Sequence, residues 1–592
     1  MSLRSADAIC PDETLHGTPE GSPDTSVPGM VDDVTLVLSD TVREAVARAG
    51  LAPVATTDIV WDVPREAAHG DYATNVAMVL ARSERRPPRQ VAEAIRAHLP
   101  EADAIERTEV AGPGFLNVFL SERFCHAGLA RVLATGDRYG RGAEGVGRRA
   151  QVEFVSANPT GPLTLGHGRQ AILGDCVARL FEAMGWATTR EYYFNDAGRQ
   201  MRVLGESVRA RYLELLGRPA PFPEDGYRGD YIREIAQALR DDKGDGLTGE
   251  GHEALFTQAA VSAIFADIRR TLERLGIRFD VYYNEASLYT ERKLEETLAA
   301  LRERELVYER DGATWLRFSA IGRPQDRVLI KSSGEPTYRL PDIAYHREKL
   351  RRGFDRILNV QGSDHIEEAK DVVAAVGALG LPADRVRYLI HQFVTITRGG
   401  VEVKMSTRRA TYVTVDDLLD QVGNADVFRY FMVTRSPESH LNFDLDAATE
   451  RDWQKNPVFY IQYAHARVRS IEKHARERGV VPPADPEAWA LTDLSPLTSR
   501  EELAIVKTLL RYPTVVAGAA RACEPHRVAA YLYELAAQFH GYHHLGTHTP
   551  AYRVVRPEEP ALTRARLALS RAVAVVLENG LGLLGITAPE SM

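Results

Sequence analysis

The segment that most constrains how this chain can fold is residues 151–184. It opens with QVEFV, a short β-branched run that predicts a buried strand. Asn158, Pro159, Gly161 and Pro162 then break the strand, and apolar residues at three- and four-residue spacing predict an amphipathic helix. The start of such a helix offers backbone N–H groups and a positive dipole end to an anion. The pattern indicates an α/β domain with an anion site, and an ordinary strand-to-helix loop is the alternative.

A second segment, residues 403–409, reads VKMSTRR. A lysine, a small hydroxyl residue and two arginines in one loop suit the phosphates of a nucleotide. Together the two segments resemble the signatures of the class I aminoacyl-tRNA synthetases, His-x-Gly-His and Lys-Met-Ser-Lys-Ser.

Among these families, the arginyl-tRNA synthetases resemble the chain closely, in blocks that occur in the family's order. The blocks are HGDYATN at 69–75, AGPGFLN at 111–117, NPTGPLTLGHGR at 158–169, NDAGRQ at 195–200, PTYRLPDIAYH at 336–346, KMSTR at 404–408, RSPESHLNFDLD at 435–446 and NPVFYIQYAHAR at 456–467. They span most of the chain.

The resemblance implies a multidomain α/β protein. Residues 31–120 would form a small N-terminal α/β domain that contacts tRNA, and 121–147 a linker. Residues 148–420 would form a Rossmann-like class I synthetase catalytic domain with a helical insertion at about 201–283. Residues 421–592 would form an all-α anticodon-binding bundle.

Composition limits the class of protein. The hydrophobic fraction of 44% and charged fraction of 26% are those of a globular chain, whereas residues 1–30, rich in Pro, Gly and Ser, predict a disordered tail. The 4 cysteines are far apart in the sequence, so no disulfide framework is indicated. No apolar run approaches the roughly 20 residues of a membrane span, and no secretory signal is visible. We expect a cytoplasmic monomer without a membrane partner.

The resemblance also implies where arginine binds. Ser156 and Asn158 match positions that hold the amino and carboxyl end of the substrate. Tyr338 and Asp342, four residues apart on one helical face, match positions that hold its side chain; a solvated helix carboxylate is the alternative for Asp342. Further arginine-binding candidates are His167, Asn195, Asp196, Asp364 and His365.

The implied reaction has two steps. The carboxylate of arginine attacks the α-phosphate of Mg-ATP to give arginyl-adenylate and pyrophosphate, and the arginyl group then moves to the terminal ribose of tRNA-Arg. No enzyme nucleophile is needed, so catalysis would rest on positioning and on cations near the phosphates. The candidate cations are His167 and Lys404, and the other catalytic candidates are Thr164 and Gly166. ATP-binding candidates are Pro159, Gly166, His167, Gly168, Lys404, Met405, Ser406 and Arg408.

The chain departs from the family's His-x-Gly-His, because Thr164 replaces the first histidine. A hydroxyl can donate a hydrogen bond to phosphate but cannot carry positive charge, and losing one transition-state donor typically costs about 3 kcal/mol. Three accounts fit: compensation by other cations, a slower paralogue for a specialised pathway, and a paralogue that binds tRNA without charging it. The retained His167, Lys404, Tyr338 and Asp342 favour an active enzyme.

The C-terminal region is basic in an otherwise acidic chain. Residues 451–592 hold 17 Lys and Arg against 14 Asp and Glu, whereas the whole chain has a net charge of -9. In the family this bundle reads the anticodon by stacking and base-edge contacts. The tRNA-binding candidates are Tyr460, Tyr463, His465 and Arg467, and helix packing is the alternative for them.

Two further patterns carry less weight. His540, His543, His544 and His548 have helical spacing, but no carboxylate obviously accompanies them, so we predict no metal site. GLGLLG at 580–585 matches a dinucleotide motif, yet too few residues follow to complete a βαβ unit. Alternative functions are another class I synthetase specificity, the non-charging paralogue and a general nucleotidyltransferase. The RSPESH block and the N-terminal unit argue against the first, and the helical RNA-binding end against the last.

Overall fold

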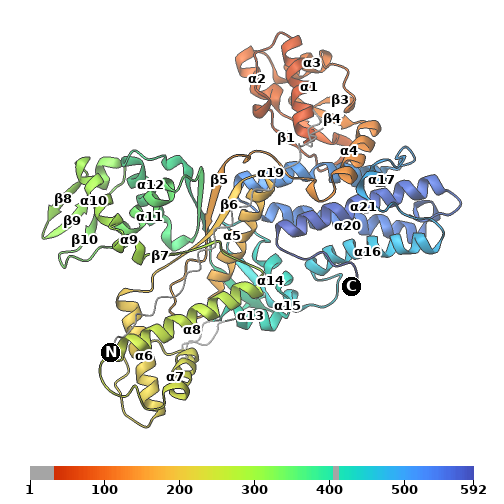
Figure 1. Ribbon diagram of the computed structural model, residues 1–592. Helices are drawn as coiled ribbons and strands as arrows, with labels where there is room; N and C mark the ends of the chain where they lie inside the picture. The colour runs from red at the N-terminus through yellow and green to blue at the C-terminus, as the bar shows by residue number, and fades with distance from the viewer. Residues whose placement is uncertain (1–32, 404–412) are drawn as a thin grey trace, which may run out of the picture.

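The computed structural model describes residues 33–403 and 413–592 (Figure 1). The predicted disordered tail at 1–30 therefore lies outside the described residues, as do the predicted site residues Lys404, Met405, Ser406 and Arg408. In Figure 1 the N-terminal unit lies at the top, a sheet at the centre, and a bundle of long C-terminal helices on the right.

A five-stranded parallel sheet forms the centre of the molecule. In spatial order its strands are β12 (Val386–His391), β11 (Arg356–Gly362), β5 (Arg149–Glu153), β6 (Ala187–Phe194) and β7 (Val281–Asn284). The middle strand is fully buried at Ala150 and Val152, and helix α5 (Leu165–Ala183) follows it and packs on the sheet. A parallel sheet needs cover on both faces, and the apolar run of β5 supplies the contacts. The predicted α/β fold class is confirmed.

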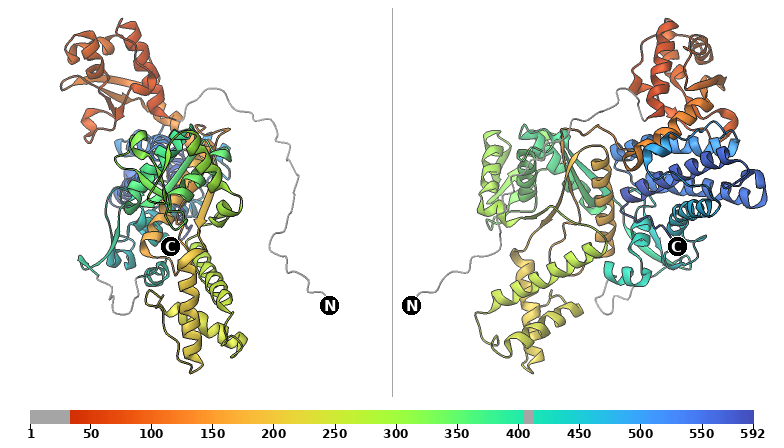
Figure 2. Two further views of the ribbon diagram at one scale, coloured as in Figure 1. Left: turned by 90° about the vertical axis from the view of Figure 1, so that its left-hand side faces the viewer. Right: turned by 45° about the vertical axis from the view of Figure 1, so that its right-hand side comes forward.

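A helical unit joins β6 to β7. Its helices are α6 (Gly198–Leu215), α7 (Asp230–Lys243) and α8 (Glu253–Arg274). They pack on one another through buried residues such as Leu204, Ile235 and Phe256, and they extend away from the sheet on the side opposite the N-terminal unit (Figure 2). The last residues of the predicted insertion instead form β7, because the aromatic-rich run VYYN pairs with β6.

A second unit, which the sequence analysis did not predict, lies between β7 and β11. It contains a small antiparallel sheet with its own core around Leu301, Leu316 and Phe318. Its strands are β8 (Val307–Arg310), β9 (Ala313–Leu316) and β10 (Arg327–Ile330), and its helices are α9 (Ala286–Thr290), α10 (Lys293–Glu303) and α11 (Arg339–Arg351). Helix α12 (Ile366–Ala378) follows β11 and packs against α11.

The N-terminal unit is a four-stranded antiparallel sheet with helices on it. The strands are β1 (Trp61–Asp62), β2 (Tyr72–Thr74), β4 (Phe115–Leu120) and β3 (Ile105–Ala111), and the helices are α1 (Val34–Arg48), α2 (Val76–Glu84) and α3 (Pro88–Ala97). Residues 121–147, predicted as a linker, contain helix α4 (Glu122–Thr135). Contacts across to the C-terminal helices hold this segment: His126 Nε2 lies 2.9 Å from the carbonyl of Leu497, and the Tyr139 hydroxyl donates to that of Leu509.

The C-terminal part is mostly helical, as predicted, but the region 421–592 is not all-α, because one strand at residues 441–444 pairs with an earlier strand. Its helices are α13 (Val415–Val422), α14 (Ala425–Met432), α15 (Leu445–Thr449), α16 (Pro457–Glu477), α17 (Pro486–Ala490), α18 (Arg500–Leu510), α19 (Tyr512–Ala522), α20 (His526–His548) and α21 (Pro560–Leu583). A short sheet is made of β14 (Val401–Glu402), β13 (Val394–Arg398) and β15 (Leu441–Asp444), and β15 lies between α14 and α15 in the chain.

One segment of the described chain, Arg500–Ala522, is long and apolar enough to cross a membrane by length and composition. The sequence analysis had expected no such run. In the structure the segment comprises α18 and α19, which pack against α4 and α20, and 56% of its apolar window is buried. Buried core helices pass the same test, so the segment is weak evidence for a membrane span.

A buried arginine joins three parts of the fold. Arg429 on α14 donates to the carbonyl of Leu584 after α21, to the carbonyl of Leu275 after α8, and to the carboxylate of Asp175 on α5, at 2.9, 2.7 and 2.5 Å. Gly585, the last glycine of GLGLLG, has φ +67°, and a Cβ there would collide with the Arg429 guanidinium. The glycine motif therefore serves helix docking at this junction.

Candidate active site

A cavity of about 1090 Å³ opens at the C-terminal ends of the parallel strands. Residues that line it follow β5, β6, β7, β11 and β12, which is the edge where open α/β sheets bind ligands. We call it the sheet cavity. The predicted residues on its wall are Ser156, Asn158, Thr164, Gly166, His167, Asn195, Tyr338, Asp342, Asp364 and His365.

The turn after β5 is strained. Val155 and Ser156 have φ of +66° and +44°, values that non-glycine residues rarely adopt and that cluster at functional sites. Here they turn the backbone so that the Ser156 hydroxyl donates to Glu153 Oε1 at 2.9 Å and accepts from the Tyr193 amide at 3.2 Å. This ties the turn to the neighbouring strand.

Asn158 makes the second tie between the same two strands. Its Oδ1 accepts from the Asn195 amide at 2.9 Å, and its Nδ2 donates to Gln200 Oε1 at 3.2 Å. The predicted Ser156, Asn158 and Asn195 are thereby brought to one wall of the sheet cavity. Asp196, also predicted, accepts from Asn284 Nδ2 instead and is not among the lining residues.

Five carboxylates, of Glu153, Glu285, Asp342, Asp364 and Glu368, line the sheet cavity. Asp342 is only partly exposed, and burial together with the charges of Glu368, Glu153 and Glu285 raises its pKa well above the ordinary 3.8. Within the described residues neither Asp342 nor Glu285 forms a salt bridge. The electrostatics of this wall therefore favour a cationic ligand.

Two other carboxylates of the sheet cavity, those of Glu153 and Glu285, are held by neighbouring side chains. Lys349, with no exposed surface, contacts the Glu153 carboxylate and Asn359 Oδ1. Glu285 accepts hydrogen bonds from the Tyr193 and Tyr289 hydroxyls at 2.7 and 3.2 Å. These hydrogen bonds fix the positions of the acids, and Glu285 is held by hydroxyl groups and not by a salt bridge among the described residues.

His365 and Glu368 form a pair at the start of α12. His365 Nδ1 lies 3.1 Å from Glu368 Oε2. The contact raises the pKa of His365 and lowers that of Glu368. Asp364, also predicted, is on the same turn and is exposed. This wall therefore combines the acids with one histidine that can be charged.

The start of α5 forms another part of the wall. The Thr164 amide donates to His167 Nδ1 at 3.2 Å, and Thr164 Oγ1 lies 3.1 Å from the same nitrogen. Burial lowers the pKa of His167 below its ordinary 6.5. His167 is therefore a neutral hydrogen-bond donor rather than the cation that we expected.

Two more predicted residues do not line the sheet cavity, and a third lines it but is largely exposed. Gly168 does not line the sheet cavity: a Cβ there would lie 3.0 Å from Val415 and 3.1 Å from Phe428, so the glycine allows α5 to pack on α13 and α14. Pro159 is buried and is not among the lining residues. Tyr338 lines the cavity but is 78% exposed, because it precedes the first turn of α11.

The sequence analysis missed Glu153, Glu285 and Glu368. A signal existed for two of them, since Glu153 ends a buried strand and Glu285 directly follows the strand VYYN, where sheet ligands bind. The signal for Glu285 was missed because the strand VYYN was counted in the predicted helical insertion. Glu368 had no local signal, since an acidic residue in the first turn is ordinary for a helix.

The predicted tRNA-binding residues divide into two groups. Tyr460, Tyr463 and Arg467 lie beside Trp453; the Trp453 and Tyr463 rings are 4.2 Å apart, and the Arg467 guanidinium lies 4.6 Å from the Tyr463 ring. His465 is 1% exposed, and its Nδ1 contacts the carbonyl of Pro589 at 2.8 Å. His465 therefore packs the chain end, and only the other three could meet a ligand.

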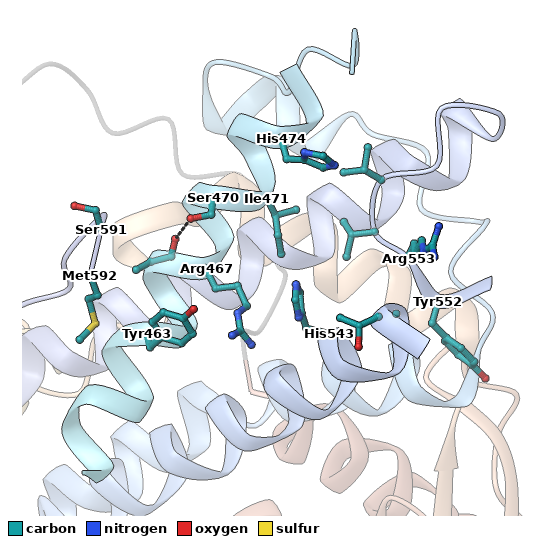
Figure 3. Close-up of a pocket in the computed structure, with 15 residues that line it drawn as sticks. Tyr463, Arg467, Ser470, Ile471, His474, His543, Tyr552, Arg553, Ser591 and Met592 are labelled. Carbon is teal, nitrogen blue, oxygen red and sulfur yellow. Dashed lines mark hydrogen bonds between the residues drawn. The ribbon is translucent and has the colours of Figure 1, made fainter. Parts of the chain in front are cut away.

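Tyr463 and Arg467 also line a second cavity, of about 630 Å³, between α16, α20 and the chain end (Figure 3). We call it the bundle pocket. No Asp or Glu is among its described lining residues. The polar and aromatic side chains on its wall are Tyr463, Arg467, Ser470, His474, His543, Thr547, Tyr552, Arg553 and Ser591.

One of the histidines of α20, His540, has both of its ring nitrogens in contact with protein groups. His540 Nε2 lies 3.0 Å from the carbonyl of Tyr460, and its Nδ1 lies 3.0 Å from Arg467 Nη1. Both ring nitrogens are thus engaged, and burial lowers the pKa of His540 to about 4. This histidine connects α20 to α16.

Comparison with known proteins agrees with this architecture. Three family models match: "Arginyl tRNA synthetase N terminal domain" at 36–120, "tRNA synthetases class I (R), catalytic domain" at 129–221 and 245–427, and "DALR anticodon binding domain" at 461–592. The chain is 50% identical to an arginine–tRNA ligase of Desulfotalea psychrophila over 90% of this chain and 94% of that one. It belongs to the arginyl-tRNA synthetase family.

Further members support the assignment. The Pelodictyon phaeoclathratiforme arginine–tRNA ligase is 47% identical over 93% of this chain and 99% of its own. A structure described as a putative arginyl-tRNA synthetase from Campylobacter jejuni superposes with a TM-score of 0.71, at 30% identity, over 80% of this chain and all of that one. The Thermus thermophilus arginyl-tRNA synthetase, at 23% identity and TM-score 0.70 over 94% and 100%, shares the fold.

Family membership confirms the predicted family, fold class and ligase class of this arginyl-tRNA synthetase chain. The non-charging paralogue finds no support in these comparisons, in which the relatives are arginine–tRNA ligases over nearly their whole length. Thr164 therefore has to be explained within an active enzyme.

Proposed function

We propose that the chain activates L-arginine with Mg-ATP and transfers the arginyl group to the 3′ end of tRNA-Arg. One observation carries the proposal: the sheet cavity holds Asp342 and Glu285 without a salt bridge among the described residues, beside the start of α5. A guanidinium is a flat cation with five donors that binds carboxylates in pairs. The carboxylates would recognise it, and the helix start would take the phosphates.

At the arginine end, we assign the side chain of the substrate to Asp342 and Glu285, with Tyr338 at the rim. Ser156, Asn158 and Asn195 would orient its amino and carboxyl end, since the strained turn after β5 presents them together. A buried charge that gains its partner only with the substrate gives specificity, because an analogue without the charge leaves it unpaired.

At the nucleotide end, we assign the phosphates to Gly166, the free amides of α5 and the Nε2–H of His167. Gly166 is exposed at the helix start, and a Cβ there would meet little. Lys404 and Arg408 would add positive charge and Ser406 a hydroxyl hydrogen-bond donor, as the resemblance implies. Mg²⁺ would arrive with ATP, since it is usually held by substrate phosphates with few protein carboxylates; the acids of the cavity wall are oxygen donors of the kind it takes.

For tRNA, we propose a division of labour: residues 31–120 and 421–592 bind the RNA, and 148–420 carry out the chemistry. The bundle pocket supports this, because stacking tyrosines and arginines without acidic neighbours suit unstacked bases and phosphates. We further propose that the enzyme works as a cytoplasmic monomer without a membrane partner.

The test is aminoacylation of purified tRNA-Arg with labelled arginine and ATP, using the full chain beside Thr164→His. Arginine-dependent charging by the wild type is the expected result. An absence of charging by both proteins would overturn the proposal. Restoration by Thr164→His alone would overturn the view that Thr164 suits an active site.

A further inference from the structure

Position 164 determines which nitrogen of His167 carries a proton. The Thr164 amide donates to Nδ1 of the ring at 3.2 Å. A backbone N–H can only donate, so Nδ1 must be the acceptor and carry no proton. In a neutral imidazole the proton then sits on Nε2, and Thr164 Oγ1, 3.1 Å from Nδ1, is left to donate as well.

The ring nitrogen that carries the proton is available to a ligand. His167 lines the sheet cavity, and within residues 33–403 and 413–592 its Nε2 has no hydrogen-bond partner. The ring belongs to the first turn of α5, where backbone amides also lack helical acceptors. Nε2–H and these amides together form one set of donors.

A threonine is suited to this arrangement for a local reason. Thr164 is the N-cap of α5 and His167 is the third residue of the helix, the spacing of a capping box. In that motif a Ser or Thr at the N-cap pairs with an acceptor three residues later, usually Glu or Gln. Here the acceptor is the Nδ1 of an imidazole, so the cap and the orientation of the ring are one interaction.

We propose that Thr164 is a positioning residue whose hydroxyl and amide hold His167 as the Nε2–H tautomer, aimed at the phosphates of the nucleotide. This inference rests on the proposed function, because that function supplies the phosphates. Thr164 acts through His167 and does not contact the nucleotide itself. The chain thereby uses one neutral imidazole donor, that of His167, held in place by Thr164. The family's motif has a histidine at the position of Thr164 as well.

A double-mutant cycle on the full chain tests whether Thr164 acts through the ring. Thr164→Val removes the hydroxyl at nearly constant volume, and we expect the charging rate to fall roughly tenfold to hundredfold, as for a misplaced catalytic group. Thr164→Ser should restore most of that loss. In a His167→Gln background, Thr164→Val should change the rate by less than about twofold. An equal loss in both backgrounds would show direct contact with the nucleotide and overturn the proposal.

Nitrogen NMR of histidine-labelled full chain tests the tautomer without activity. The His167 signals are assigned by their loss in His167→Gln. We expect Nε2 protonated and Nδ1 bare in the wild type, and a larger share of the other tautomer in Thr164→Val, which keeps the amide donor and loses the hydroxyl. A protonated Nδ1 in the wild type would overturn the inference even if the enzyme charges tRNA. A wild type that fails to charge would overturn the proposed function and leave the tautomer result standing.

A control separates loss of a cap from loss of positioning. The Ser121 hydroxyl accepts from the Phe124 amide at 3.1 Å and caps α4, away from the sheet cavity. Ser121→Ala should lower stability as a lost N-cap does, by roughly 1 kcal/mol, with the charging rate kept. A comparable fall in rate for this variant would mean that the Thr164 effect is merely structural.

Discussion

The sheet cavity and the bundle pocket differ in the charge that they present. Five carboxylates line the first, and burial together with neighbouring carboxylates raises the pKa of Asp342. The basic residues on the same wall, Arg199, Lys331 and Arg339, each form a salt bridge with an acid outside the lining. The second presents Arg467, Arg553 and histidines beside tyrosines, and no acidic side chain among the described residues. In a chain with a net charge of -9, acidic and basic side chains are therefore distributed differently between the two cavities. Net charge alone would have indicated neither ligand.

The difference teaches how each cavity is built. Of the acids of the sheet cavity, Glu153 and Glu285 come from strand ends, whereas Asp342 and Glu368 come from helices α11 and α12. Buried partners such as Lys349 fix their positions. The bundle pocket is formed by side chains of two helices and the chain end. The sheet cavity suits a small rigid cation, and the bundle pocket suits a base on a flexible RNA strand.

The variant Asp342→Asn is the strongest test of the contrast between the sheet cavity and the bundle pocket. Loss of one partner of a buried charge pair typically costs roughly 2–5 kcal/mol, so we expect kcat/KM for arginine to fall about a thousandfold. Steady-state charging kinetics measure it. Asp384→Asn, at an exposed acid away from the cavity, is the matched control. Unchanged kinetics in Asp342→Asn would remove the acidic wall from arginine recognition.

The next largest effect is one on stability, at the junction where Arg429 joins α5 to the C-terminal helices. Gly585→Ala forces a positive φ on alanine and drives its Cβ into Arg429, for a loss of roughly 3 kcal/mol in unfolding free energy. Gly582→Ala meets nothing within 4 Å and should be neutral or slightly stabilising. Denaturant unfolding compares the two variants. Equal stability would show that the Arg429 junction does not hold the bundle.

Tyr463→Ala tests the bundle pocket. Loss of one stacking ring typically costs roughly 1–3 kcal/mol, so KM for tRNA should rise about thirtyfold while KM for arginine is kept. Filter binding of tRNA and charging kinetics measure both constants. Tyr308→Ala, at a half-buried tyrosine of β8, is the control for general destabilisation. A change in KM for arginine alone would contradict the division between the two cavities.

The smallest effect is one of pH. The raised pKa of Asp342 means that the empty cavity holds its proton to a pH above 3.8, while arginine binds the ionised form. Arginine affinity should therefore rise with pH through that window, by at most about tenfold per unit, and binding should release a proton. Calorimetry in two buffers of different ionisation enthalpy measures the release. Proton uptake on binding would contradict the raised pKa.

Local patterns predicted the elements near the site well. The run QVEFV and the apolar spacing after Pro162 gave β5 and α5, and Phe115–Leu120 is a strand as predicted. Both patterns are periodic and lie within a short stretch of sequence. Local residue chemistry therefore determines these strands and this helix. The resemblance then supplied Ser156, Asn158 and Asp342, which the structure brings to one cavity.

Other features depend on contacts between distant segments. The hairpin of β8 and β9 is by contrast local, with Asp311 and Gly312 at positive φ in its turn, and the sequence analysis overlooked this Asp-Gly signal. Gly168 resembles a phosphate glycine in sequence, yet Val415 and Phe428 decide its role. His465 was expected to meet RNA, and the returning chain end at Pro589 buries it. Such partners lie tens to hundreds of residues away.

The central claim is that the sheet cavity selects a cation. The most direct measurement compares arginine with citrulline, its neutral isostere, in ATP- and tRNA-dependent charging by the wild type and Asp342→Asn. We expect the wild type to prefer arginine by at least about a thousandfold, since a neutral analogue leaves buried charges unpaired, and the variant to lose most of that preference. Equal use of arginine and citrulline by the wild type would contradict the account.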